Sequence, residues 1–150
     1  MIIKGAVVQG GADTFTAQTV LTGLTIDGKT GWLVKGFKAY WSNGYTAAAT
    51  DAISNCVLAT ISTATPPSSD DEICRVSWGV QNTAGVAVAF SFEPSKRGDI
   101  LEPRLTVQSD LYVHASSTST GITNTFYYEI EYELVKLTDI EVLRLMVGGA

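Results

Sequence analysis

Charged residues, histidine and cysteine are all scarce in this 150-residue sequence. It contains ten Lys and Arg, fifteen Asp and Glu, one His and two Cys, and its formal net charge is −5. Charged residues make up 17% of the chain, against about 25% in an average soluble domain. Much of the surface must therefore consist of Ser, Thr, Gly and Ala, which suits a protein whose faces are covered by neighbouring molecules.

The shortage of basic residues argues against nucleic-acid binding. Lys and Arg occur singly, apart from the pair Lys96-Arg97, and the N-terminal segment Met1 to Gly5 has no basic arm. Affinity for nucleic acid comes largely from neutralising phosphates, which requires a cluster of positive charge. We therefore predict no direct binding of nucleic acid.

Long apolar runs are also missing. No stretch approaches the ~18 consecutive apolar residues of a membrane-spanning helix. The apolar run at the start has neither the length nor the flanking residues of a signal peptide. We predict a soluble protein with no membrane span and no signal peptide.

One histidine and two cysteines leave little material for a catalytic or metal site. His114 is the sole candidate for a histidine base, and it lies on the polar face of a predicted strand, where we expect an ordinary surface or pocket-edge residue. Cys56 and Cys74 lack the paired spacing of a zinc site. We expect two buried thiols, with a disulfide as the alternative. We predict no catalytic residue, no metal and no cofactor.

Two groups of carboxylates are candidate sites. Asp70-Asp71-Glu72 lies in a predicted loop and would bind Ca²⁺ only with further oxygen ligands from elsewhere. Alternate glutamates on one strand face lie ~6.6 to 7 Å apart, a separation compatible with a glycosidase pair. Such rows are far commoner as a solvated face or as the partner of basic residues, which is our expectation for Glu129, Glu131 and Glu133.

Three tryptophans offer a different kind of site. Trp32, Trp41 and Trp78 could stack on a sugar, as aromatic residues do in carbohydrate-binding sandwiches. Aromatic residues at strand spacing more often belong to the core or to a subunit interface. We expect these three in the core.

Turn-forming residues divide the chain into segments of strand length. Gly, Pro, Asn, Asp and Ser clusters separate runs of apolar or alternating residues, and Asp27-Gly28 favours a tight hairpin. The predicted extended segments cover residues 2–9, 14–26, 32–41, 53–63, 72–80, 86–92, 105–114 and 126–137. With no helix between them, these segments favour antiparallel pairing. We predict one all-β domain over residues 1–150, an antiparallel β-sandwich of the eight-stranded single jelly-roll type.

Side-chain alternation assigns faces to two of these strands. In 32–41 the pattern places Trp32, Val34, Gly36 and Tyr40 on one face and Leu33, Phe37, Ala39 and Trp41 on the other. In the last strand Phe126, Tyr128, Ile130, Tyr132 and Leu134 face one way and the three glutamates the other. The apolar face of the last strand is predicted to lie against the core.

A short helix is predicted to close the chain. Thr138-Asp139-Ile140-Glu141 has the spacing of a capping box. Apolar residues then recur at helical spacing, at Ile140, Leu143 and Val147. A helix of about two turns must dock on something, here its own sandwich or a neighbour.

In layout, the chain resembles the single jelly-roll capsid proteins of small icosahedral viruses. The segments that carry the resemblance are Gly31 to Phe37 after a tight turn, the Pro-bearing loop Leu101-Glu102-Pro103-Arg104, the terminal strand Phe126 to Leu137, and the helical tail. The resemblance implies a structural protein of the virion, without catalytic residues, that contacts copies of itself and other capsid subunits in an icosahedral shell. The missing basic arm departs from this family and puts direct genome binding in doubt.

Two other functions remain open. A carbohydrate-binding, lectin-like sandwich would use Trp32, Trp41 or Tyr45. A virion spike or decoration protein would form a closed trimer. An enzyme ranks last, since no constellation of residues supports one.

Overall fold

The computed structural model describes residues 1–10, 15–21, 29–41, 52–64, 71–83, 86–90, 104–107, 110–118 and 125–148. Within these ranges the chain forms nine strands and one helix. The strands are β1 (Ile2–Val8), β2 (Thr16–Leu21), β3 (Thr30–Trp41), β4 (Ala52–Ala59), β5 (Glu72–Thr83), β6 (Val86–Phe90), β7 (Arg104–Val107), β8 (Leu111–Ser117) and β9 (Thr125–Lys136). The helix α1 covers Asp139–Gly148.

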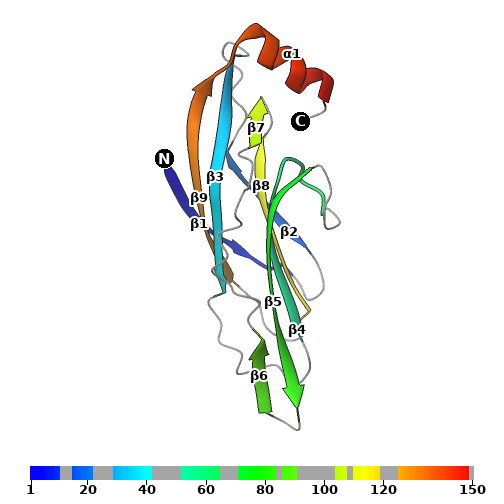
Figure 1. Ribbon diagram of the computed structural model, residues 1–150. Helices are drawn as coiled ribbons and strands as arrows, with labels where there is room; N and C mark the ends of the chain where they lie inside the picture. The colour runs from blue at the N-terminus through cyan, green and yellow to red at the C-terminus, as the bar shows by residue number, and fades with distance from the viewer. Residues whose placement is uncertain are drawn as a thin grey trace.

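The strands form two antiparallel sheets. The first sheet has the order β1-β9-β3-β7, and the second has the order β2-β8-β4-β5-β6. Figure 1 shows them as two layers of an elongated, sandwich-like molecule, with α1 at one end. The prediction of an all-β fold with a short C-terminal helix is confirmed. No helix in the described ranges is long and apolar enough to cross a membrane.

The core lies between the sheets because alternate side chains of each strand turn inward. β9 contributes Phe126, Tyr128 and Ile130, all 4% exposed or less, as the alternation predicts. Further along β9, Tyr132 is half-buried and Leu134 is 46% exposed. Leu58 of β4 and Leu111 and Val113 of β8 pack against these residues from the second sheet. Both layers therefore share one core.

Gly5 of β1 is required by this packing. It pairs with Tyr128 of β9, and a Cβ atom placed on it would lie 2.2 Å from the Tyr128 hydroxyl. The Tyr128 ring thus occupies the space that any other side chain at position 5 would need.

The predicted assignment of β3 side chains to its two faces is wrong from Gly36 onward. The register with β9 shifts between Val34 and Gly36, so Lys35 is an extra residue in a β-bulge. Because one extra residue reverses the alternation, the buried side chains of β3 share one face: Trp32, Val34, Phe37 and Ala39. Without the bulge Lys38 would point into the core.

The alternating residues from 105 to 114 also differ from the prediction. They form two strands, β7 in the first sheet and β8 in the second, and not one. The chain passes from the first sheet to the second between Val107 and Leu111, and the alternation of apolar residues does not reveal this change of sheet. The described residues consequently contain nine strands where the sequence favoured eight.

The capping box of α1 is confirmed. The Glu141 carboxylate accepts hydrogen bonds from the Thr138 backbone N–H at 2.7 Å and from its hydroxyl at 2.8 Å. Lys29, which directly precedes β3, forms an exposed ion pair at 2.8 Å with Asp139, the first residue of the helix. Ile140 and Leu143 are 64% and 60% exposed, so the described residues do not cover the apolar side of the helix.

The two cysteines are free, buried thiols, as expected. Cys56 of β4 and Cys74 of β5 both turn toward the core. Burial raises the pKa of Cys74 to about 11 and raises that of Cys56 further. Both thiols are therefore protonated at neutral pH and belong to the packing.

Candidate functional site

The outward side of the first sheet carries a group of six charged side chains and a hollow. We define this outer face of the first sheet by Lys4 on β1, Lys35, Lys38 and Tyr40 on β3, and Tyr127, Glu129, Glu131 and Glu133 on β9. The register places Lys4, Glu129 and Lys38 in one row across three strands. Positive charge therefore flanks the central glutamates on both sides.

The glutamate row is paired within the sheet itself. Lys4 Nζ lies 2.8 Å from Glu129 Oε1, and Lys35 pairs with Glu133. The hydrogen bond from Lys4, helped by one from Tyr40, lowers the pKa of Glu129. The hydrogen bond from Lys35 likewise lowers the pKa of Glu133. The expected basic partner is thus supplied by the neighbouring strands of the same sheet.

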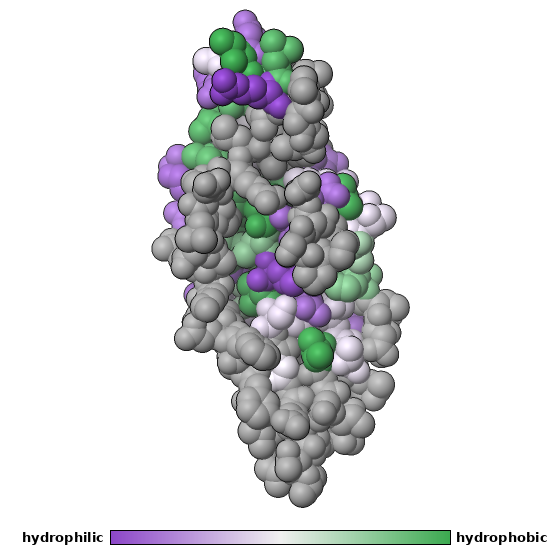
Figure 2. Space-filling model, turned by 45° about the vertical axis from the view of Figure 1, so that its right-hand side comes forward, coloured by the Kyte–Doolittle hydropathy of each residue, from purple (hydrophilic) through white to green (hydrophobic). Residues whose placement is uncertain are grey.

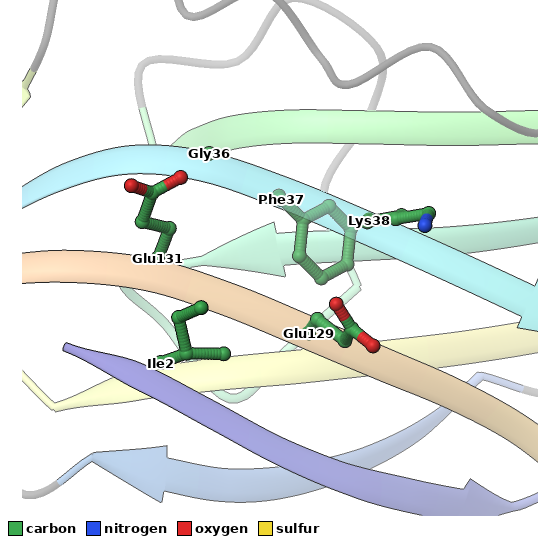
Figure 3. Close-up of a pocket in the computed structure, with 6 residues that line it drawn as sticks. All are labelled: Ile2, Gly36, Phe37, Lys38, Glu129 and Glu131. Atoms are coloured by element: carbon green, nitrogen blue, oxygen red, sulfur yellow. The ribbon is translucent and has the colours of Figure 1, made fainter.

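A hollow of about 250 Å³ opens on this face beside the β3 bulge (Figure 3). Its lining residues are Ile2, Gly36, Phe37, Lys38, Glu129 and Glu131. Gly36 has no side chain to fill the space between β3 and β9. It directly follows Lys35, the extra residue of the bulge. The hollow is smaller than the roughly 300 to 1,000 Å³ of a typical small-molecule site.

Two glutamates of the outer face have pKa values opposite to what a glycosidase acid needs. Glycoside cleavage needs one carboxyl group that holds a proton near neutral pH, which requires a raised pKa. Glu129 and Glu133 have lowered pKa values because lysines bind them. Both carboxylates therefore remain ionised and serve as hydrogen-bond acceptors.

Two tyrosines also lie on this face, and neither is a predicted site residue. Tyr40 of β3 and Tyr127 of β9 are partners in the register, and Tyr127 is 47% exposed. Lys38 Nζ lies 4.9 Å from the centre of the Tyr40 ring, in a cation–π contact. Extending the glutamate alternation back by one step would have identified Tyr127.

His114, the sole histidine, is buried, which corrects the prediction of a surface or pocket-edge residue. It does lie on the outward face of β8, but it is 1% exposed, and its Nε2 atom is 2.7 Å from the Ile61 carbonyl oxygen. The rings of Phe15 and Tyr112 pack edge-on, each 6.5 Å from the imidazole centre. Burial lowers the pKa of His114, with a further decrease from the Arg75 charge.

The remaining predicted candidates are dispersed. Glu72 is bound by Arg75, with Oε2 2.7 Å from Nη2, so its carboxylate is engaged in an ion pair. Trp32 is 6% exposed and packs edge-on against Tyr132 at 5.3 Å, as expected of a core residue. Over the described ranges, no three His, Cys, Asp or Glu side chains gather as a metal site would require. Several candidates lie outside the described residues: the side chains of Trp41 and Trp78, and all of Tyr45, Asp70 and Lys96-Arg97.

Comparison with known proteins adds no relative to these observations. No protein-family description, no curated protein and no solved structure matches the chain.

Proposed function

We propose that this protein is a structural subunit of a viral capsid, which assembles with copies of itself and with other coat chains into an icosahedral shell of the virion. In this role it acts through its surfaces and carries no catalytic residue, metal or cofactor. The genome is enclosed by the shell without direct contact to this acidic chain.

The order of the strands supports a jelly roll, the fold that many capsid proteins share with lectins and cupins. A jelly roll has eight strands in two sheets built from Greek keys. If β6 is taken as an addition beside β5, each sheet holds four strands, β1-β9-β3-β7 and β2-β8-β4-β5. Most connections in this order pass from one sheet to the other, and only β4 and β5 follow each other within a sheet.

The observation that carries the proposal is the position of the exposed large apolar side chains. Ile2 and Val8 of β1 are 62% and 54% exposed, and Met1, which directly precedes the strand, is 58% exposed. On α1, Ile140 and Leu143 are exposed to a similar extent, and apolar surface is visible at the helical end of the molecule in Figure 2. Apolar side chains gathered on particular elements mark surfaces that other molecules cover. A subunit that contacts several copies of itself would bury both regions.

Light scattering after gel filtration, with negative-stain microscopy across salt and pH, tests this proposal. We expect rings of five or six subunits or closed particles. A closed trimer would favour a virion spike or decoration protein instead. A protein that stays monomeric at high concentration under all conditions would rule the shell out.

A carbohydrate-binding module is the second candidate, and the pair Tyr40 and Tyr127 is what favours it. An exposed tyrosine ring beside ionised carboxylates offers both a stacking surface and acceptors for sugar hydroxyls. Trp32 is buried and is therefore unsuited to this role. A glycan array tests this function, with Tyr127→Ala as the variant that should abolish any binding and Tyr112→Ala as a control on the other sheet.

A further inference from the structure

β1 forms an edge of the first sheet, and its hydrogen-bonding groups on one side have no partner among the described residues. Of the strands that the structure describes, β9 alone pairs with it. Met1 and Tyr132 exchange backbone hydrogen bonds in both directions, so they are a hydrogen-bonded pair. Because antiparallel pairs alternate in type, Ile3, Gly5 and Val7 also bond to β9. Figure 3 shows β1 lying outside β9 at the margin of the sheet.

The other alternate residues, Ile2, Lys4, Ala6 and Val8, direct their N–H and C=O groups away from the sheet. Their side chains all lie on the outer face, where Ile2 and Val8 are 62% and 54% exposed. The register with β9 is unbroken over all seven residues, and the strand contains no proline. Its single charge, on Lys4, is paired with Glu129. Proteins usually blunt a sheet edge with bulges, prolines or free charges, and β1 has none of these devices.

We propose that β1 pairs antiparallel with β1 of a second copy of this chain, about a two-fold axis at Gly5. This inference takes its partner, a second copy, from the proposed self-assembly, and it names the contact surface. The pairing would join two four-stranded sheets into one continuous sheet of eight strands.

The sequence of β1 is complementary to itself in this register. Ile2 lies opposite Val8 of the second copy, and Lys4 lies opposite Ala6 of the second copy. Each of these pairs occurs twice by symmetry, so all four outward-directed residues exchange their backbone hydrogen bonds. The exposed apolar side chains at the two ends of the strand cover each other. Gly5 meets Gly5 of the second copy at the axis, where the close approach of a non-hydrogen-bonded pair suits a residue without a side chain.

Neighbouring registers are less favourable. A shift of two residues in one direction places Lys4 opposite Lys4 of the second copy, and like charges directly opposite each other are unfavourable. A shift in the other direction pairs Lys4 with Val8 of the second copy and leaves Ile2 beyond the end of the ladder. The register centred on Gly5 is the one that pairs every available group without opposing two charges.

Charge substitutions at Ile2 and Val8 test both the surface and the register. Ile2→Lys and Val8→Glu should each weaken self-association about tenfold in sedimentation equilibrium, because every substitution occurs twice in the interface. The double variant should restore the wild-type affinity, because Lys at position 2 then faces Glu at position 8 of the second copy. Leu134→Lys, at an exposed apolar position on β9, is the matched control and should associate like the wild type. If Val8→Glu alone strengthens association, Lys4 faces position 8 and the proposed register is wrong.

Amide hydrogen exchange gives a second readout that does not depend on variants. In dilute monomer, the amides of Ile3, Gly5 and Val7 should exchange slowly and those of Lys4, Ala6 and Val8 rapidly. On association the rapid set should become protected and the alternation should disappear. Persistent rapid exchange of Lys4 and Ala6 in the assembled protein would overturn the pairing.

The outcomes separate this inference from the proposed function. Particles that form equally well with Ile2→Lys and Val8→Glu contradict the β1 contact and leave the shell intact. Dimers that depend on β1 but never grow into larger particles support the contact and contradict the shell. A wild-type protein that never associates contradicts both.

Discussion

The outer faces of the two sheets come from the same strand alternation, yet they are exposed to very different degrees. On the first sheet, the paired side chains of Lys4 and Glu129 are 67% and 28% exposed. On the second sheet, Val57 and His114 are each 1% exposed, and the paired Arg75 and Glu72 are 15% and 11% exposed. The difference shows that outward direction from a sheet does not establish contact with water, because chain segments such as the one carrying Ile61 can cover a face.

The largest expected effect comes from placing one charge on each face. Val57→Lys would bury an ammonium group between Arg75 and His114 and should destabilise the protein by at least ~3 kcal/mol. Tyr127→Lys on the first sheet should change the free energy of unfolding little, because the new charge reaches water. Urea unfolding followed by circular dichroism measures both. Equal losses in the free energy of unfolding would mean that the two outer faces do not differ in their exposure to water.

A smaller contrast is expected when an ion pair is removed from each face. Arg75 donates to both carboxylate oxygens of Glu72, with Nε 3.2 Å from Oε1 and Nη2 2.7 Å from Oε2. Arg75→Ala leaves the shielded Glu72 carboxylate without this partner and should lower the free energy of unfolding by ~2 kcal/mol. Lys4→Ala should have little effect, since exposed pairs contribute little. The same unfolding measurement applies, and a greater loss for Lys4→Ala would reverse the comparison.

The two faces should also lose stability in different pH ranges. The pKa of His114 is lowered from its usual 6.5 by burial, so the unfolded chain binds a proton more readily than the folded one. Stability should therefore fall as the pH decreases through about 6.5. His114→Gln, which keeps a donor for the Ile61 carbonyl, should flatten the melting temperature between pH 7 and 5. A slope that persists in this variant would assign the effect to another group.

The smallest expected effect belongs to the glutamates of the first sheet. The pKa of Glu129 is lowered from 4.5 by the hydrogen bond from Lys4, so the stabilisation is present above pH 4.5 and is lost as the pH falls below it. Glu129→Gln should reduce only the loss of stability that occurs below pH 4.5. Salt at 1 M should weaken the same contribution, because exposed charges are screened. Neither Glu129→Gln nor 1 M salt should alter the decrease in stability between pH 7 and 5 that His114 causes.

Local features were predictable from the sequence where the residue pattern is regular and the interactions that form the feature lie within one strand or helix. The inward row of β9 from Phe126 to Ile130 follows from simple alternation, and the capping box at Thr138 and Glu141 follows from spacing alone. The faces of β3 were missed, although a signal was present. Lys35 and Lys38 are three residues apart, so both can point outward only if the inward-outward alternation reverses between them. Gly36 marks a position where a bulge can cause this reversal.

Other features carry no local signal. The polar run Gln108-Ser109-Asp110 is compatible with a turn, but it does not indicate that the chain leaves one sheet for the other, because the apolar residues on both sides of it alternate with the same phase. The burial of His114 depends on Phe15 and Ile61, which are distant in the sequence. The hollow beside Gly36 requires β1, β3 and β9 side by side.

The sequence alone determined the all-β class, the shortage of positive charge, the inward row of β9, the buried thiols and the start of the helix. These follow from composition and from the two-residue and 3.6-residue periods, which act within one element. The tertiary structure alone decided which outward faces are wet, which strand is left at the sheet edge, and how lysines from two strands hold the glutamates of a third. Those properties depend on which segments become neighbours, and the free energy of such contacts is shared among residues far apart in the chain.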